Sequence, residues 1–134
     1  LGERDPGSLA SAANYAGLLA DLERWSEAEP VARQALSVCR ADLGAQNALT
    51  MKCANILGNA EMALDRCREA EVLLREAFQG RCELLGDSHP DTLESATNLA
   101  ALLYKQGRVE EADKIQHESL ARFREQLRAR RPTQ

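Results

Sequence analysis

The dipeptide Leu-Gly occurs at positions 1, 43 and 85, a fixed spacing of 42 residues. The register between the three copies holds without a gap, and a fixed period of this length is typical of repeat proteins. We therefore divide the chain into repeats of residues 1–42, 43–84 and 85–126, followed by a basic helical extension at 127–134. The aligned positions include Ser8, Thr50 and Thr92; Ala12, Ala54 and Ala96; Arg24, Arg66 and Arg108; and Leu36, Phe78 and Leu120.

The composition of the repeats predicts helices. Ala and Leu supply most of the apolar residues, aromatic residues make up only 4% of the chain, and β-branched residues are scarce, so a sheet is hard to build. In the third repeat, apolar residues recur at helical spacing on either side of Gly107, which we expect to separate two helices. Each repeat is thus predicted to be a helix-turn-helix unit.

Local start signals support this division into helices. Pro90 suits the first turn of a helix, where the missing N–H costs nothing, and Asn47 is the expected N-cap in the second repeat. In the first repeat, Ser26 and Glu29 have the spacing of a capping box, and we expect Ser26 to cap the second helix. Pro132 is expected to end the last helix.

A single helix-turn-helix unit cannot bury its own apolar face, whereas three stacked units form a continuous core. The sequence therefore predicts one all-α domain, an α-solenoid of three helix-turn-helix repeats.

The charge and motifs of the chain exclude several classes of function. A formal net charge of −4 disfavours a nucleic-acid binder, and no apolar run is long enough to span a membrane. Cys39, Cys53, Cys67 and Cys82 lack the spacing of a zinc site, and we favour reduced structural thiols over two disulfides. No nucleophile motif, phosphate loop or paired acid and base is visible, so we expect neither an enzyme nor a cofactor or metal.

Two segments carry a resemblance to a known family. The third repeat contains "HPDTLESATNLAALLYKQGRVEEAD" and the first contains "WSEAEPVARQAL", and both are similar to the long, 42-residue variety of the tetratricopeptide repeat found in kinesin light chains and nephrocystin-type proteins. The resemblance covers residues 1 to about 126. It implies a right-handed superhelix whose first helices form a concave groove that binds a protein or peptide.

Matching this family's groove positions residue by residue implies a binding site on the second and third repeats. Asn55 and Asn59 lie four residues apart and would hydrogen-bond a bound peptide; the alternative is a solvated polar helix face. Tyr104 is either a groove anchor or part of ordinary packing between repeats. In this class, Asn14 and Asn98 more often brace neighbouring helices than contact a ligand. The implied peptide-binding residues are Lys52, Asn55, Asn59, Met62, Glu94, Thr97, Tyr104 and Lys105.

Three interpretations of function remain open from the sequence. The first is a non-catalytic, cytoplasmic adaptor or scaffold that binds a protein or peptide in the groove. The second is a structural segment that associates with other copies through its repeat ends, since a repeat without a polar capping helix leaves an apolar end. The third is a sensor array that regulates an attached signalling ATPase.

Overall fold

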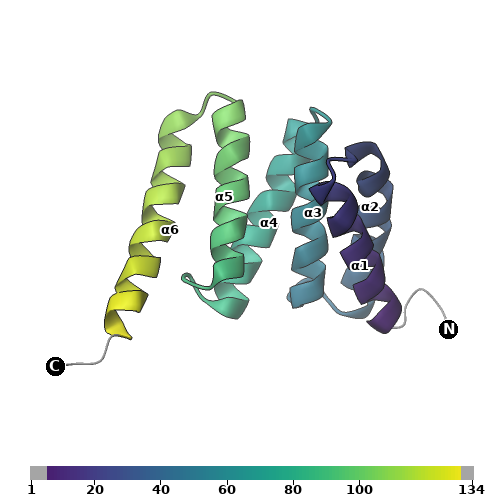
Figure 1. Cartoon of the computed structure of the whole chain (residues 1–134), viewed down its shortest axis with the longest axis horizontal. Helices are drawn as coiled ribbons and strands as arrows, with labels where there is room; N and C mark the ends of the chain where they lie inside the picture. The colour runs from purple at the N-terminus through teal and green to yellow at the C-terminus, as the bar shows by residue number, and fades with distance from the viewer. Residues whose placement is uncertain (1–5, 131–134) are drawn as a thin grey trace.

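The computed structural model describes residues 6–130, and residues 1–5 and 131–134 lie outside that range. This part of the chain forms six helices in three hairpins, with α1 and α6 at opposite ends of the row (Figure 1). The helices are α1 (Pro6–Asp21), α2 (Trp25–Asp42), α3 (Ala48–Ala63), α4 (Cys67–Leu85), α5 (Pro90–Lys105) and α6 (Val109–Ala129). The all-α solenoid predicted from the sequence is therefore confirmed.

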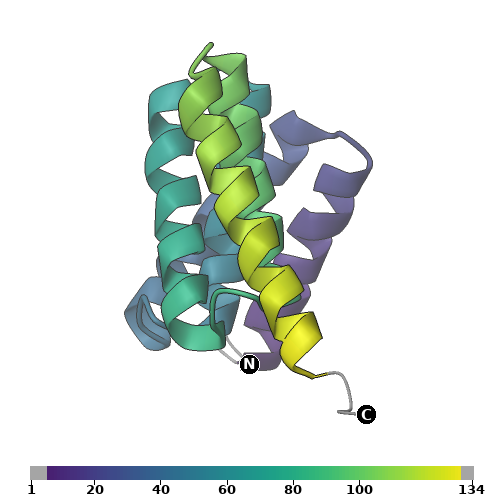
Figure 2. The same ribbon diagram turned by 90° about the vertical axis from the view of Figure 1, so that its left-hand side faces the viewer.

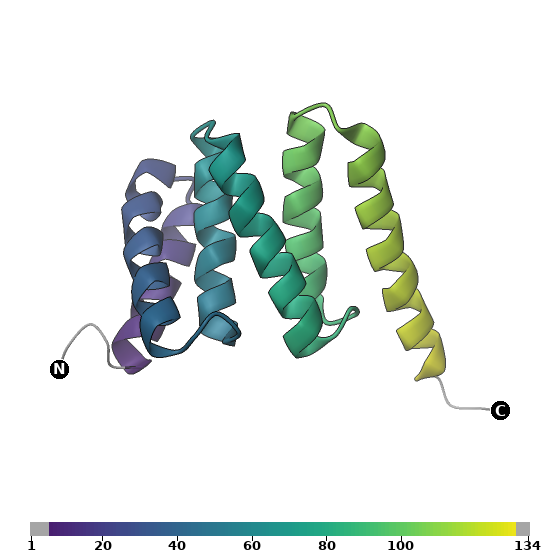
Figure 3. The same cartoon turned by 180° about the vertical axis from the view of Figure 1, so that it is seen from behind.

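The first helices of the hairpins pack against one another, and the second helices lie behind them. The helix α3 contacts α1, α2, α4 and α5, and α5 contacts α3, α4 and α6. Seen from behind, α2 and α4 lie on the face opposite α1 and α3 (Figure 3). This arrangement leaves α1, α3 and α5 to line a common surface.

Three of the predicted helix boundaries are confirmed. The helix α5 begins at Pro90, with His89 as its N-cap. Asn47 caps α3 by accepting a hydrogen bond from the Leu49 N–H at 2.8 Å. Gly107, with φ of +79°, follows α5 and separates it from α6.

The predicted capping box of the first repeat is wrong. The helix α2 already begins at Trp25, its N-cap Arg24 makes no side-chain capping bond, and Ser26 lies inside the helix. A left-handed residue lies in the turn before α2 and in the turn before α4, with φ of +58° at Glu23 and +64° at Asp65. This turn recurs after 42 residues and sets the helix start, so it overrides the local Ser26 signal. The predicted stop at Pro132 lies outside the described residues.

Two buried threonines fix the loops that lead into α3 and α5. The Thr50 hydroxyl donates to the Gly44 carbonyl and the Thr92 hydroxyl donates to the Gly86 carbonyl, both at 2.8 Å. Gly44 and Gly86 have φ of +86° and +95°, which only glycine adopts readily. The two bonds are at equivalent positions of successive repeats, and they hold the N-terminal ends of α3 and α5 in the same orientation.

Ion pairs join successive hairpins in the same register, and we call these four pairs the ion-pair ladder. Each pair individually adds little to stability at a solvated surface, but the repeated geometry fixes how one hairpin sits on the next. The ladder consists of Arg33–Glu69, Arg75–Glu111, Arg66–Glu29 and Arg108–Glu71.

The buried bond of Thr92 gives a test of this loop geometry. Thr92→Val keeps the side-chain shape but removes the hydroxyl donor to Gly86, so we expect a loss of about 1–2 kcal/mol in the free energy of unfolding, measured by urea denaturation. Thr97→Val, at an exposed position of the same helix, is the matched control and should change stability by less than about 0.5 kcal/mol. Equal effects of the two substitutions would contradict this role.

Candidate functional site

A polar groove of about 730 Å³ lies along the first helices of the three hairpins. All of its lining residues come from α1, α3 and α5 except Arg81, which comes from α4. The lining residues are Asn14, Gly17, Leu18, Asp21, Lys52, Asn55, Ile56, Asn59, Arg81, Asp91, Glu94 and Asn98.

The side chain of Arg81 joins α4 to the start of α5. Only 6% of this residue is exposed. Its Nη1 donates to the Asp91 carbonyl oxygen at 2.9 Å, to Ser95 Oγ at 2.9 Å and to Glu94 Oε1 at 3.2 Å. A buried guanidinium with these partners is a fixed, charge-neutralised part of the groove wall.

Asn55 extends the same network across α3 and α5. It is 4% exposed, so the interpretation of this residue as a solvated polar face is wrong. Its Oδ1 accepts a hydrogen bond from Ser95 Oγ at 3.2 Å, and its Nδ2 donates to Glu94 Oε1 at 3.5 Å. Asn55 therefore forms part of the floor of the groove and holds two repeats together.

Lys52 and Asn14 form a second bridge, between α1 and α3. The Lys52 ammonium donates to Asn14 Oδ1 at 2.7 Å. The expectation that Asn14 braces neighbouring helices is confirmed by this bond. Lys52 lies in the groove as the sequence predicted, but its cation is already engaged.

Asn59 differs from Asn14 and Asn55 because its side-chain carbonyl oxygen has no hydrogen-bond partner. Its Oδ1 is buried, and no donor of the described residues reaches it. A buried acceptor without a donor costs free energy. Asn59 therefore offers a binding ligand an unused acceptor.

The structure separates the eight residues that the sequence singled out. Lys52, Asn55, Asn59 and Glu94 line the groove, whereas Met62, Thr97, Tyr104 and Lys105 are not among its lining residues.

Tyr104 and Lys105 have partners near the end of α5. The Lys105 ammonium donates to the Met62 carbonyl at 2.8 Å and lies 2.9 Å from Asp65 Oδ1, and its hydrogen bond to Asp65 raises the pKa of Lys105. The Tyr104 hydroxyl donates to Asp113 of α6, which raises the pKa of Tyr104.

Arg81 is the groove residue that sequence reasoning missed most clearly. The aligned positions of the other repeats hold Cys39 and Phe123, so an arginine here breaks an apolar pattern. That break was the available signal. Asp91 was also absent from the residues assigned to the groove from the sequence, although its carbonyl oxygen accepts from Arg81 and the residue lines the groove.

A second polar cluster, also missed, lies at the junction of the first two repeats around Glu61. This residue is fully buried, at 0% exposure, although Leu19 and Leu103 occupy the aligned core positions. Arg66 Nη1 lies 3.3 Å from Glu61 Oε1, and Arg33 Nη2 lies 3.5 Å from Oε2. The alignment of a glutamate with two leucines was the signal for this site.

The protonation of Glu61 depends on its burial and on two neighbouring carboxyl groups. Burial, together with hydrogen bonds to Glu69 and Glu29, raises the pKa of Glu61 to about 7. Hydrogen bonding to Glu61 and Arg33 lowers the pKa of Glu69. The cluster therefore keeps a proton on Glu61 at pH values where an exposed glutamate is ionised.

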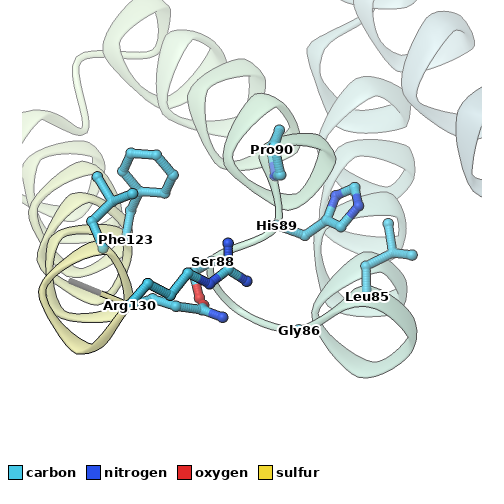
Figure 4. A pocket seen from close by; sticks show the side chains of 9 residues that line it. Leu85, Gly86, Ser88, His89, Pro90, Phe123 and Arg130 are labelled. Carbon is cyan, nitrogen blue, oxygen red and sulfur yellow. The ribbon is translucent and has the colours of Figure 1, made fainter. Parts of the chain in front are cut away.

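A separate cavity of about 310 Å³ lies between the loop before α5 and the end of α6. Leu85, His89 and Phe123 are among its lining residues (Figure 4). In residues 6–130, no group of three or more His, Cys, Asp or Glu side chains is arranged to hold a metal ion. None of the helices in this range is long and apolar enough to cross a membrane.

The repeated hairpins and the groove along their first helices define a helical-repeat solenoid protein. The sequence model of the tetratricopeptide repeat matches residues 8–83 and 54–125, and the chain belongs to this family. No curated protein sequence matches the chain.

Solved structures that share the fold include two proteins related to kinesin light chains. One is BtubC (BKLC) from P. vanneervenii, with a TM-score of 0.80 and 21% identity over 98% of this chain and 52% of that one. Another is a putative kinesin light chain from Podosopora anserina with nearly identical TPR-like repeats, with a TM-score of 0.78 and 23% identity over 96% of this chain and 60% of that one. The chain thus spans about half to three fifths of their lengths. The resemblance to kinesin-light-chain-like repeats is confirmed at the level of the fold.

The Glu61 cluster makes a prediction about stability and pH. Because the pKa of Glu61 is higher in the folded chain, at about 7, than its ordinary value of 4.5, the folded state binds the extra proton between these values. This contribution to stability is complete below about pH 4.5 and is lost as the pH rises to about 7. Glu61→Leu, which restores the residue of the aligned positions, should raise the free energy of unfolding by about 1–3 kcal/mol at pH 7.5 and by less at pH 5.

Urea denaturation at the two pH values measures this difference. Glu61→Gln is the control, since it abolishes the titration while keeping the side-chain size and polarity. A gain for Glu61→Leu that is the same at pH 5 and pH 7.5, or a loss of stability at pH 7.5, would contradict the account of the cluster.

Proposed function

We propose that the chain is a non-catalytic protein-interaction module whose groove binds an extended peptide segment of a partner protein. Tetratricopeptide repeats generally mediate protein–protein interaction, and the chain belongs to that family. The groove supplies a continuous polar surface along three helices, which suits the regularly spaced N–H and C=O groups of an extended chain.

The observation that carries the proposal is the buried carbonyl of Asn59. A peptide N–H placed at this oxygen would satisfy an acceptor that no described residue satisfies. Asn14, Asn55 and Lys52 are already paired with protein groups, so they would shape the groove around that contact. On this basis Asn59 is the central ligand-binding residue of the site.

The charges of the groove favour recognition of peptide backbone over capture of a free carboxylate. Arg81 is bonded to Glu94 and Ser95, and Lys52 to Asn14, while Asp21 and Asp91 are exposed. The lining side chains thus hold three carboxylates, of Asp21, Asp91 and Glu94, against the two cations, and this negative balance disfavours a C-terminal carboxylate. Peptides with neutral or basic side chains fit this surface better than acidic ones.

The proposal extends the site past the groove to Met62, Thr97, Tyr104 and Lys105, the remaining residues implied by the family resemblance. Tyr104 is 42% exposed, and an exposed tyrosine offers contact area at a low cost in entropy. The proposal also places the chain in the cytoplasm. Its four cysteines are free thiols, and such a state suits a reducing compartment.

Selection from a random peptide library against the immobilised chain tests the groove. Asn59→Ala should raise the Kd of the selected peptides about fivefold to tenfold, since one hydrogen bond is lost, while the free energy of unfolding stays the same or rises. Gln79→Ala, at an exposed position of α4, is the control and should leave the Kd unchanged. Failure to select any peptide, or equal binding by the Asn59→Ala variant, would refute the groove as the site.

A further inference from the structure

An unusual apolar stripe runs along α1 at one end of the row of helices. It consists of Ser11, Tyr15 and Leu18, which lie on one face of α1, and of Leu22, which directly follows the helix, and we call it the α1 stripe. Tyr15, Leu18 and Leu22 are 55%, 56% and 58% exposed. Leu57 and Ala60, which are aligned with Tyr15 and Leu18 in the second repeat, are 2% and 0% exposed, because the first repeat covers them.

The helix α6 forms the opposite end of the row and faces the viewer in Figure 2. It carries a matching stripe of side chains. It consists of Gln116, Leu120, Phe123 and Leu127, the α6 stripe. Leu120 and Leu127 are 46% and 47% exposed, whereas Leu36, aligned with Leu120, is 3% exposed. Phe123 also borders the 310 Å³ cavity beside the loop before α5 (Figure 4), and Leu127 is another of the residues that line it.

Inside the row, stripes of these two kinds pack against each other. Leu36 of α2 and Leu57 of α3 belong to one core cluster. Phe78 of α4 and Leu99 of α5 occupy the aligned positions one repeat later and pack in a second cluster. If the same packing continued for one more repeat, Leu120 would contact a residue at the position of Tyr15.

The charges at the two ends complement each other in the same register. In the ion-pair ladder, Arg66 pairs with Glu29 and Arg108 pairs with Glu71. Asp113 on α6 is aligned with these glutamates, and Arg24 before α2 is aligned with these arginines.

A second position of the ladder repeats this complementarity. Arg33 pairs with Glu69 and Arg75 pairs with Glu111. At the α6 end, His117 is aligned with these two arginines, and at the α1 end, Glu27 is aligned with these two glutamates. The α1 end thus carries apolar and charged residues that match those of the α6 end of the same chain.

We propose that copies of this chain associate head to tail, with the α1 stripe of one copy seated on the α6 stripe of the next. Arg24 of the second copy pairs with Asp113 of the first, and Glu27 of the second copy faces His117 of the first. The junction repeats the packing between hairpins inside the chain. Because such a contact is heterologous, it generates an open chain of copies rather than a closed two-fold dimer. This association uses the ends of the row, and Leu18 is the one residue of the two stripes that also lines the groove.

Sedimentation velocity of the 134-residue chain in reducing buffer tests the association. Over about a hundredfold range of concentration, the weight-average sedimentation coefficient should rise steadily. A single monomeric species throughout that range would overturn the proposal.

Two complementary variants test the head-to-tail geometry. Leu18→Glu blocks the α1 end and Leu120→Glu blocks the α6 end, and both positions are exposed, so both variants should fold. Each alone should be monomeric. An equimolar mixture should form a 1:1 dimer and stop there, because only the intact α1 end of Leu120→Glu and the intact α6 end of Leu18→Glu remain.

The control is Val72→Glu, which places the same charge at a residue that is 68% exposed and belongs to neither stripe. It should associate as the unmodified chain does. Continued self-association of either end variant alone, a mixture that stays monomeric, or loss of association in Val72→Glu would each overturn the proposal.

Discussion

The packing of α3 against four other helices is the constraint on which the other features depend. The first and last hairpins each bury one side against the middle hairpin, so α3 provides the surface that a lone hairpin lacks. Its burial is reflected in its small residues. Gly58 allows close approach to Leu74, since a Cβ at Gly58 would lie 2.6 Å from Leu74 Cδ2. The second repeat is therefore the one whose sequence departs furthest from the other two.

Because α3 lies between the first and the last hairpin, its polar side chains can bond to both, and this makes the groove polar and rigid. Asn55 and Lys52 emerge from α3 and are held by Ser95 on one side and Asn14 on the other. Arg81 reaches the groove from the layer behind and holds the start of α5. These bonds use the polar side chains as links between repeats. Asn59 is distinguished from them by its unused carbonyl oxygen.

Much of the fold follows from the 42-residue period, because the turns recur in register. The alignment predicted the helices, and the local signals at Asn47 and Pro90 located two of their starts. The prediction failed at Ser26, where the repeated left-handed turn decided the helix start instead of the local cap signal. The site was less predictable, since position in the sequence does not show which polar side chains bond to each other. Arg81 and Glu61 were missed for this reason, although each interrupts an apolar column of the alignment.

Amide hydrogen exchange, followed residue by residue at a concentration where the chain is monomeric, tests most directly whether stacking on α3 holds the molecule together. Local openings that expose only part of a structure cost less free energy than global unfolding. The account predicts that the amides of α3 exchange most slowly and that those of α1 and α6 exchange faster, because each of these helices packs on one side only. Protection of α1 or α6 equal to that of α3 would contradict it.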